Sequence, residues 1–240
     1  YAKILDLKGN IVRKLKKKEL VTRNDLSYQA FYQDDLVTEF NLYWSEYPYR
    51  VEYSYSIEED EYLFLALWTP LYKANALTID GSLEVDIPYD YPIRISASEE
   101  LFFKESEQVG RKILSWKSTM IKRESRDEIY SSTMEFPTVK IVPEEFKYGV
   151  YGKSESWSSF GNWLDQLNKD TDQLTLQEKW TVEKLIDGTN NRNEIIKSMY
   201  NYLQDQTKYV NVAIDVGGLK SYPASYVCEN KYGDCKALTT

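Results

Sequence analysis

The spacing of hydrophobic residues changes once along this chain of 240 residues, and the change limits the folds it can adopt. Over roughly the first 145 residues, apolar side chains alternate with polar ones, as at Leu83, Val85 and Ile87. After about residue 150 they recur at helical spacing, as at Trp157 and Phe160. Alternation is typical of a strand with one buried face, and the wider spacing is typical of a helix. The sequence therefore predicts a mainly β domain over residues 1–148 and an α+β domain over residues 149–240.

The first part contains many short strand patterns separated by turn signals. Ala2–Leu7 and Ile11–Leu15 flank Lys8-Gly9-Asn10, which is a hairpin pattern. The alternating run from Val51 to Ile57 (Val51, Tyr53, Tyr55, Ile57) also predicts a strand with one buried face. Further strands are expected at Leu36–Trp44, Tyr62–Trp68, Ile93–Ser96, Lys112–Lys117 and Thr138–Val142. Short strands punctuated by prolines indicate an antiparallel β-sandwich.

The second part contains three helix patterns and then a mixed segment. The first pattern runs through Trp157, Phe160, Trp163 and Leu167. Thr175-Leu176-Gln177-Glu178 is a capping-box pattern that opens a second helix, which we expect to stop near Gly188. A third helix is expected from about Asn191, with Ile195, Ile196, Met199, Tyr200 and Leu203 on one face. A strand at Lys208–Ile214 and a loop at Val216–Pro223 then lead to the end of the chain.

The charge and hydropathy of the chain exclude two classes of function. The net charge of −8 disfavours nucleic acid as a partner, because phosphate binding needs surplus lysine and arginine. No stretch approaches the roughly 20 apolar residues of a membrane helix. The basic run Arg13–Lys18 is interpreted as a solvated strand end guarded by lysines, with a phosphate or membrane patch as the alternative.

The sequence Gly233-Asp234-Cys235 near the end of the chain has the pattern of an active-site turn. Gly233 gives close access, Asp234 is a good N-cap, and Cys235 would lie in the first turn of a helix. The helix dipole and free backbone N–H groups there favour a thiolate. A cysteine nucleophile usually needs a histidine, however, and the chain contains none. From these residues alone, a buried structural cysteine remains the alternative.

Residues Tyr202–Lys236 resemble the opening of a bacterial transglutaminase-like cysteine domain, which has a papain-like fold. The matching features are Lys208-Tyr209-Val210, Gly217-Gly218, Tyr222-Pro223-Ala224, Val227 and Tyr232-Gly233-Asp234-Cys235-Lys236. Upstream, Phe31-Tyr32-Gln33-Asp34-Asp35, Tyr47-Pro48 and Val51-Glu52-Tyr53 resemble the β-rich domain of unknown function that often precedes it. Trp157–Trp163 resembles the helical segment that joins the two.

This resemblance implies that Cys235 is the nucleophile of a Cys-His-Asp triad that acts on amide bonds in a protein or peptide. The histidine and the aspartate would lie beyond Thr240, so we expect the chain to be a fragment of an enzyme and to be inactive alone. Neither a metal nor a cofactor is implied. The resemblance, together with a chain that starts at Tyr1, suggests export to the periplasm or the cell surface. The alternative is a non-catalytic protein- or glycan-binding module on a degenerate transglutaminase-like scaffold.

Three other features have a functional and a structural interpretation, and in each the structural one is favoured. Cys228 is expected to be a small buried residue rather than a metal ligand, because zinc sites need more ligands at shorter spacing. The acidic run Glu58–Glu61 lacks the pattern of a calcium loop and is expected to be a solvated turn. The aromatic residues Trp44, Tyr47 and Tyr49 suit a sheet surface, with glycan stacking as the alternative.

Overall fold

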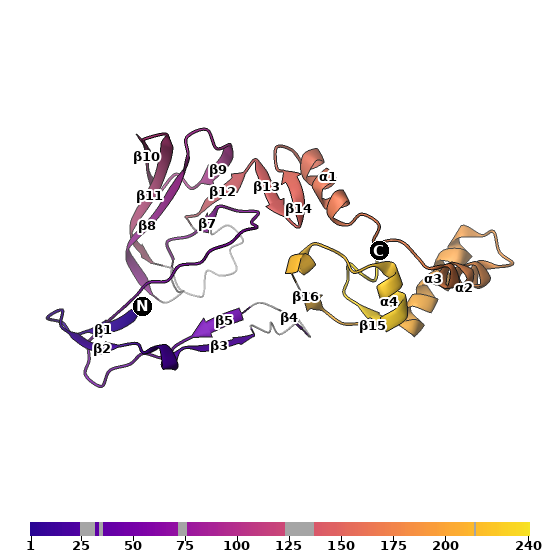
Figure 1. Cartoon of the computed structure of the whole chain (residues 1–240), viewed down its shortest axis with the longest axis horizontal. Helices are drawn as coiled ribbons and strands as arrows, with labels where there is room; N and C mark the ends of the chain where they lie inside the picture. Colours follow the sequence, from indigo (N-terminus) through magenta and orange to yellow (C-terminus); the bar gives the residue numbers. More distant parts are fainter. Residues whose placement is uncertain (25–31, 34–35, 72–75, 123–136, 214) are drawn as a thin grey trace. The chain divides into compact units, whose positions relative to one another are not determined.

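The computed structural model describes residues 1–24, 32–33, 36–71, 76–122, 137–213 and 215–240 (Figure 1). An antiparallel β-rich region comes first and is followed by a helical and mixed α+β part, as the change in spacing predicted. By its contacts the chain divides into two compact units. Unit 1 combines Tyr1–Glu59 with Leu164–Thr240, and unit 2 is Asp60–Trp163. The predicted boundary at residues 148/149 remains a prediction. Phe31, Asp34 and Asp35 of the quoted upstream motif lie outside the described residues.

Unit 2 contains two three-stranded antiparallel sheets and a hairpin. The first sheet has the order β10 (Phe102–Gln108), β11 (Arg111–Lys122), β8 (Leu77–Pro88), and the second has the order β7 (Ala66–Trp68), β12 (Val139–Pro143), β9 (Ile93–Ala97). The hairpin joins β13 (Glu145–Tyr148) to β14 (Val150–Lys153). One core cluster includes Ile87 of β8, Leu114 and Trp116 of β11, and Val139 and Ile141 of β12. The two sheets therefore share buried apolar surface, which is the main stabilising term for a unit of this kind.

The strand pattern around Leu83 was predicted correctly. Along β8 the inward positions Leu83, Val85 and Ile87 alternate with exposed Glu84 and Asp86. The expected strands at Ile93–Ser96, Lys112–Lys117 and Thr138–Val142 correspond to β9, β11 and β12. The strand β10 and the β13–β14 hairpin were not predicted. Only Ala66–Trp68 of the expected strand Tyr62–Trp68 is a strand.

The N-terminal segment of unit 1 forms two small antiparallel sheets. One has the order β2 (Ile11–Lys14), β1 (Ala2–Leu5), β6 (Arg50–Tyr53), which confirms the predicted hairpin, and the other pairs β3 (Val21–Asn24) with β5 (Leu36–Glu39). A short 3-10 helix, η1 (Lys17–Glu19), lies between β2 and β3. Arg13 and Glu19 form an ion pair, and the lysines of the basic run are exposed, as expected for a solvated strand end.

The prediction of a buried face on the Val51–Ile57 run was wrong. Only Arg50–Tyr53 is a strand, and Val51, Tyr53, Tyr55 and Ile57 are 42%, 44%, 74% and 70% exposed. Alternation places these side chains on one side of the chain, but their burial requires a second layer packed against that side. Among the described residues no such layer excludes water from them. Three of the four line a cavity instead.

The C-terminal segment of unit 1 follows α1 (Trp157–Leu167), which begins in unit 2. It contains α2 (Leu176–Ile186), α3 (Arg192–Gln206), η3 (Asp215–Gly218) and α4 (Ala224–Asn230). The capping box at Thr175 is present: its hydroxyl accepts from the Glu178 N–H, and the Glu178 carboxylate accepts from the Thr175 N–H. The side chain of Asn191 caps α3.

Two short parallel pairings complete this segment. The expected strand Lys208–Ile214 is two pieces, β15 (Lys208–Tyr209) and β16 (Val212–Ala213), while Ile214 lies outside the described residues. The strand β16 pairs with β4 (Tyr32–Gln33), and β15 pairs with β17 (Tyr232–Gly233), directly before the cysteine turn. Each of these pairings joins two segments of unit 1 that are distant in sequence.

Candidate functional site

The backbone packs tightly at Gly233, just before the predicted nucleophile. A Cβ atom added at Gly233 would lie 3.1 Å from Cβ of Ala237 and 3.2 Å from Cγ2 of Val227. Because both distances are shorter than ordinary van der Waals contacts, any larger residue would push α4 and the cysteine turn apart. Gly233 therefore allows the protein's own neighbouring segments to pack closely, while its predicted role in a nucleophile turn remains a prediction.

Asp234 caps the cysteine turn as its sequence predicted. Its carboxylate is buried, with the residue 3% exposed, and Oδ1 accepts a hydrogen bond of 2.9 Å from the backbone N–H of Ala237. The backbone N–H of Leu238 donates to the Asp234 carbonyl at 3.0 Å, as in the first turn of an α-helix. Oδ2 forms an ion pair of 2.5 Å with Nζ of Lys236. The positive charge of Lys236, the residue after Cys235, is thus engaged by Asp234.

Cys235 occupies the first position of this turn, and its residue is exposed. The alternative of a buried structural cysteine therefore does not describe it. The predicted helix is a single turn over residues 235–239 in the structure. Its other backbone hydrogen bonds run from the N–H groups of Thr239 and Thr240 to the carbonyl of Lys236. Ser221 reaches the same turn through a hydrogen bond of 2.6 Å between its hydroxyl and that of Thr240.

Cys228 has a different environment on α4. It is half-buried, and burial raises the pKa of its thiol, with a smaller contribution from the negative charge of Glu178 and an opposing one from Lys231. A raised pKa reduces the thiolate fraction at neutral pH, and the thiolate is the reactive form. Cys228 is therefore an internal reference for an unactivated thiol. It is less buried than the sequence predicted.

Three tyrosines form a cluster around α4 that was not predicted. The rings of Tyr222 and Tyr226 stack at 5.0 Å, and the hydroxyls of Tyr226 and Tyr232 share a hydrogen bond of 2.7 Å. That hydrogen bond, together with partial burial, raises the pKa of Tyr226 to about 12. Helical spacing did not predict this cluster, because Tyr222 lies before α4, which begins at Ala224 after the N-cap Pro223.

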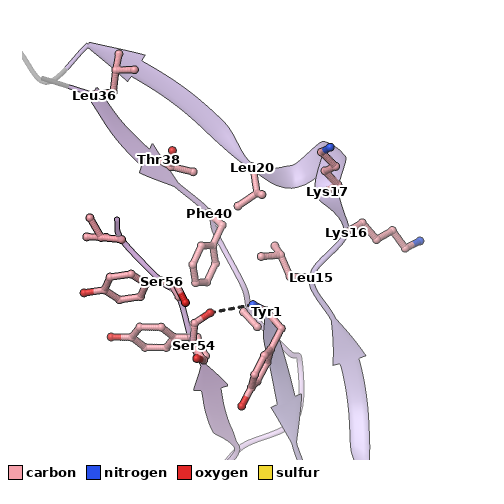
Figure 2. A pocket seen from close by; sticks show the side chains of 14 residues that line it. Tyr1, Leu15, Lys16, Lys17, Leu20, Leu36, Thr38, Phe40, Ser54 and Ser56 are labelled. Atoms are coloured by element: carbon pink, nitrogen blue, oxygen red, sulfur yellow. Dashed lines mark hydrogen bonds between the residues drawn. The ribbon is translucent and has the colours of Figure 1, made fainter. Parts of the chain in front are cut away.

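A second candidate site is a cavity of about 770 Å³ in the N-terminal segment of unit 1 (Figure 2). Its walls come from the ends of β1, η1 and β5 and from the chain after β6. Leu15, Leu20 and Phe40 gather at its centre (Figure 2). The volume lies within the range of small-molecule sites. Sequence reasoning missed it because its walls are assembled from separate strands.

The other features considered in the sequence are the acidic run, possible metal ligands, the exposed aromatic residues and possible membrane helices. Glu61 of the acidic run accepts from the Gly149 N–H at 2.7 Å and pairs with Lys147 at 2.6 Å, as a structural turn would. Across the described ranges no group of three histidine, cysteine or carboxylate side chains could hold a metal ion. Tyr47 is 79% exposed and its ring lies 5.1 Å from that of Tyr49, so the glycan alternative stays a prediction. Of the helices described, none is long and apolar enough to span a membrane.

Residues 1–124 match the family described as "Domain of Unknown Function with solved-structure structure (DUF3857)". The chain belongs to the DUF3857 family. This match spans β1 to β11 and agrees with the expected β-rich domain of unknown function. A search of curated proteins found none with significant similarity to the chain.

The DUF3857 chain also resembles a solved structure along almost its whole length. The match is a protein from Parabacteroides distasonis ATCC 8503, described as a putative protease, with a TM-score of 0.64 and 14% sequence identity. The similarity covers 99% of this chain but only 45% of that protein, so the chain spans less than half of its length. At this identity the similarity shows a shared fold.

Proposed function

We propose that this chain is part of a transglutaminase-like cysteine enzyme that acts on amide bonds, with Cys235 as its nucleophile. The observation that carries the proposal is the exposed thiol of Cys235 at the first position of a turn capped by the buried Asp234. Fold similarity to a protein described as a putative protease supports it. In this proposal the DUF3857 region is a sandwich over residues 1–148, and residues 149–240 begin a papain-like domain.

The proposed reaction starts with the Cys235 thiolate attacking the carbonyl carbon of an amide. A tetrahedral intermediate forms, and its oxyanion is held by backbone N–H groups of the turn. The C–N bond then breaks, the amine leaves with a proton from a histidine, and a thioester remains. Water releases the acid in a protease, while a second amine forms a new amide in a transglutaminase. The sequence contains no histidine, so the histidine and aspartate of the proposal belong to residues after Thr240.

The two cysteines make a matched test in the protein extended beyond Thr240. We expect Cys235→Ala to abolish cleavage or acyl transfer on a casein-type protein substrate, whereas Cys228→Ala should retain the activity. We expect the 240-residue chain itself to show no turnover, since it has no imidazole to carry protons. Full activity of Cys235→Ala would refute the assignment.

The rate of thiol alkylation gives a second test that does not need a substrate. If Cys235 in the extended protein reacts with iodoacetamide with a pH midpoint near the ordinary cysteine pKa of about 8.5, the thiol is not activated. A midpoint well below that value would support the assignment of Cys235 as the nucleophile.

We expect the protein to be exported to the periplasm or the cell surface, which fractionation of producing cells would test.

A second candidate function is binding without catalysis, on a degenerate transglutaminase-like scaffold. The observation that favours it is the cavity of about 770 Å³ in unit 1, which lies in the DUF3857 region. The two functions differ in the segment after Thr240: a histidine and an aspartate on successive strands support the enzyme. The absence of that histidine and aspartate, with ligand binding retained, supports a protein- or glycan-binding module.

A further inference from the structure

The cavity of unit 1 combines an apolar centre with polar groups on two sides. Leu15, Leu20 and Phe40 form the centre (Figure 2). The stacked rings of Tyr53 and Tyr55 also line the cavity. Leu20, Tyr55 and Ile57 are 40%, 74% and 70% exposed. Apolar side chains that meet water around a concavity typically mark a site that another molecule covers.

The charged lining residues are all positive. Lys16 and Lys17 lie at the rim in Figure 2, and the lining contains no carboxylate. Within the described part of the chain neither ammonium group forms an ion pair, whereas the nearby Arg13 is already neutralised by Glu19. Glu19, which pairs with Arg13, also interacts electrostatically with Lys16, but this single carboxylate leaves the rim with a net positive charge. The rim therefore attracts an anionic partner.

Hydroxyl groups lie on the side of the apolar centre away from the lysines. Ser54 and Ser56 line this wall in Figure 2, and in the described ranges neither hydroxyl is hydrogen-bonded to the protein. A serine hydroxyl can donate to a carbonyl oxygen. The cavity therefore offers donors on both sides of an apolar centre.

We propose that this cavity binds an extended acidic peptide segment, with an aliphatic or aromatic side chain in the apolar centre and carboxylates at the lysine rim. A polypeptide carries carbonyl acceptors along its length, so it can use the serine wall and the lysine rim together. A fatty acid has its acceptors at one end only and would leave one set of donors unused. The distribution of donors thus favours a peptide over a lipid. This inference does not depend on Cys235 being a nucleophile.

Fluorescence anisotropy with short fluorescein-labelled peptides tests the proposal on the 240-residue chain. The probe alternates glutamate with phenylalanine and leucine, and the control peptides replace glutamate by lysine or both apolar residues by alanine. We expect only the first peptide to bind, and its affinity to fall as salt is raised, because the rim charges are exposed and screened. Equal binding of the lysine peptide would overturn the charge assignment.

The basic run supplies a matched pair of variants. Lys16→Glu with Lys17→Glu reverses the rim, while Lys14→Glu with Lys18→Glu makes the same change in net charge at exposed lysines outside the lining. We expect the first double variant to weaken binding at least about tenfold, since exposed ion pairs contribute up to about fivefold each and are here replaced by repulsion. The second should bind within about twofold of the native chain. Equal weakening by both would reduce the interaction to general charge attraction and overturn the site.

A second pair of variants tests the apolar centre. Leu20→Ser removes an apolar wall, while Leu7→Ser makes the same change at an exposed leucine outside the lining. We expect only the first to weaken binding, with circular dichroism showing that both are folded. Binding of dodecanoate without binding of the acidic peptide would assign the cavity to a lipid and overturn the peptide proposal. So would the absence of any peptide binding to the folded native chain.

Discussion

Replacing Gly152 by alanine places a methyl group against the indole of Trp163. Gly152 lies on β14, and the added Cβ would be 2.5 Å from Cδ1 and 2.6 Å from Cγ of Trp163, and 2.8 Å from Cζ of Phe146. Carbon atoms in favourable contact lie about 3.5–4.0 Å apart, so the indole or the strand must move by about 1 Å. Neither ring can move into open space, since Trp163 is 2% and Phe146 is 5% exposed.

The magnitude follows from what Trp163 would lose. Its Nε1 donates to the carbonyls of Tyr148 and Val150 at 3.3 and 3.2 Å, and its ring packs 4.9 Å from that of Phe160. Overpacking costs about 1–3 kcal/mol, and a weakened hydrogen bond costs about 1 kcal/mol more. Reduced entropy of the unfolded chain offsets about 0.4–1 kcal/mol. We therefore expect Gly152→Ala to lower the free energy of unfolding by about 2–3 kcal/mol.

Urea unfolding followed by tryptophan fluorescence measures this change, with Gly161→Ala as the control. Gly161 lies in α1 two residues before Trp163, and an added Cβ there meets no atom within 4 Å. Because alanine is the better helix former, this variant should gain about 0.5–1 kcal/mol. Native-like stability of Gly152→Ala, at an unchanged denaturant slope, would show that Trp163 does not pack on β14 as described.

Asp234→Ala removes the cap acceptor from the Ala237 N–H and should cost about 1 kcal/mol in urea unfolding, whereas Asp234→Asn should cost less. Equal losses would assign the effect to the lost charge instead. Tyr232→Phe removes the hydroxyl partner of Tyr226, so near-ultraviolet titration should show the pKa of Tyr226 falling from about 12 towards 10. Because the pKa of Tyr226 is raised on folding, its contribution to stability is complete below pH 10 and is lost as pH rises towards 12. The native chain should therefore lose more stability between pH 10 and pH 12 than Tyr232→Phe does. Equal losses of stability in the two proteins would contradict the shared hydrogen bond. Burial raises the pKa of Cys228, so iodoacetamide at pH 8 should label it more slowly than an unfolded-chain control, as mass spectrometry of the labelled peptides would show; equal rates would argue against the buried environment.

Several elements were predictable because their signals are local. The capping box at Thr175 and the N-cap at Asp234 depend on atoms three residues apart, and both form as predicted. The alternation of Leu83, Val85 and Ile87 was also reliable, since β8 is covered by a core that includes Trp116 and Val139. The same reasoning failed for the Val51–Ile57 run. There the pattern was present, but no described layer packs over it.

The sequence by itself determined the order of β-rich and α+β parts, the helix caps, the absence of histidine and the position of Cys235 in a capped turn. These depend on hydrogen bonds and periodicities that span a few residues, which composition and spacing encode directly. Tertiary structure alone decided that Gly152 faces Trp163 and that Lys16, Phe40 and Ser56 share one cavity. Such contacts join different strands, helices and loops, so they depend on which strands pair and which faces are covered.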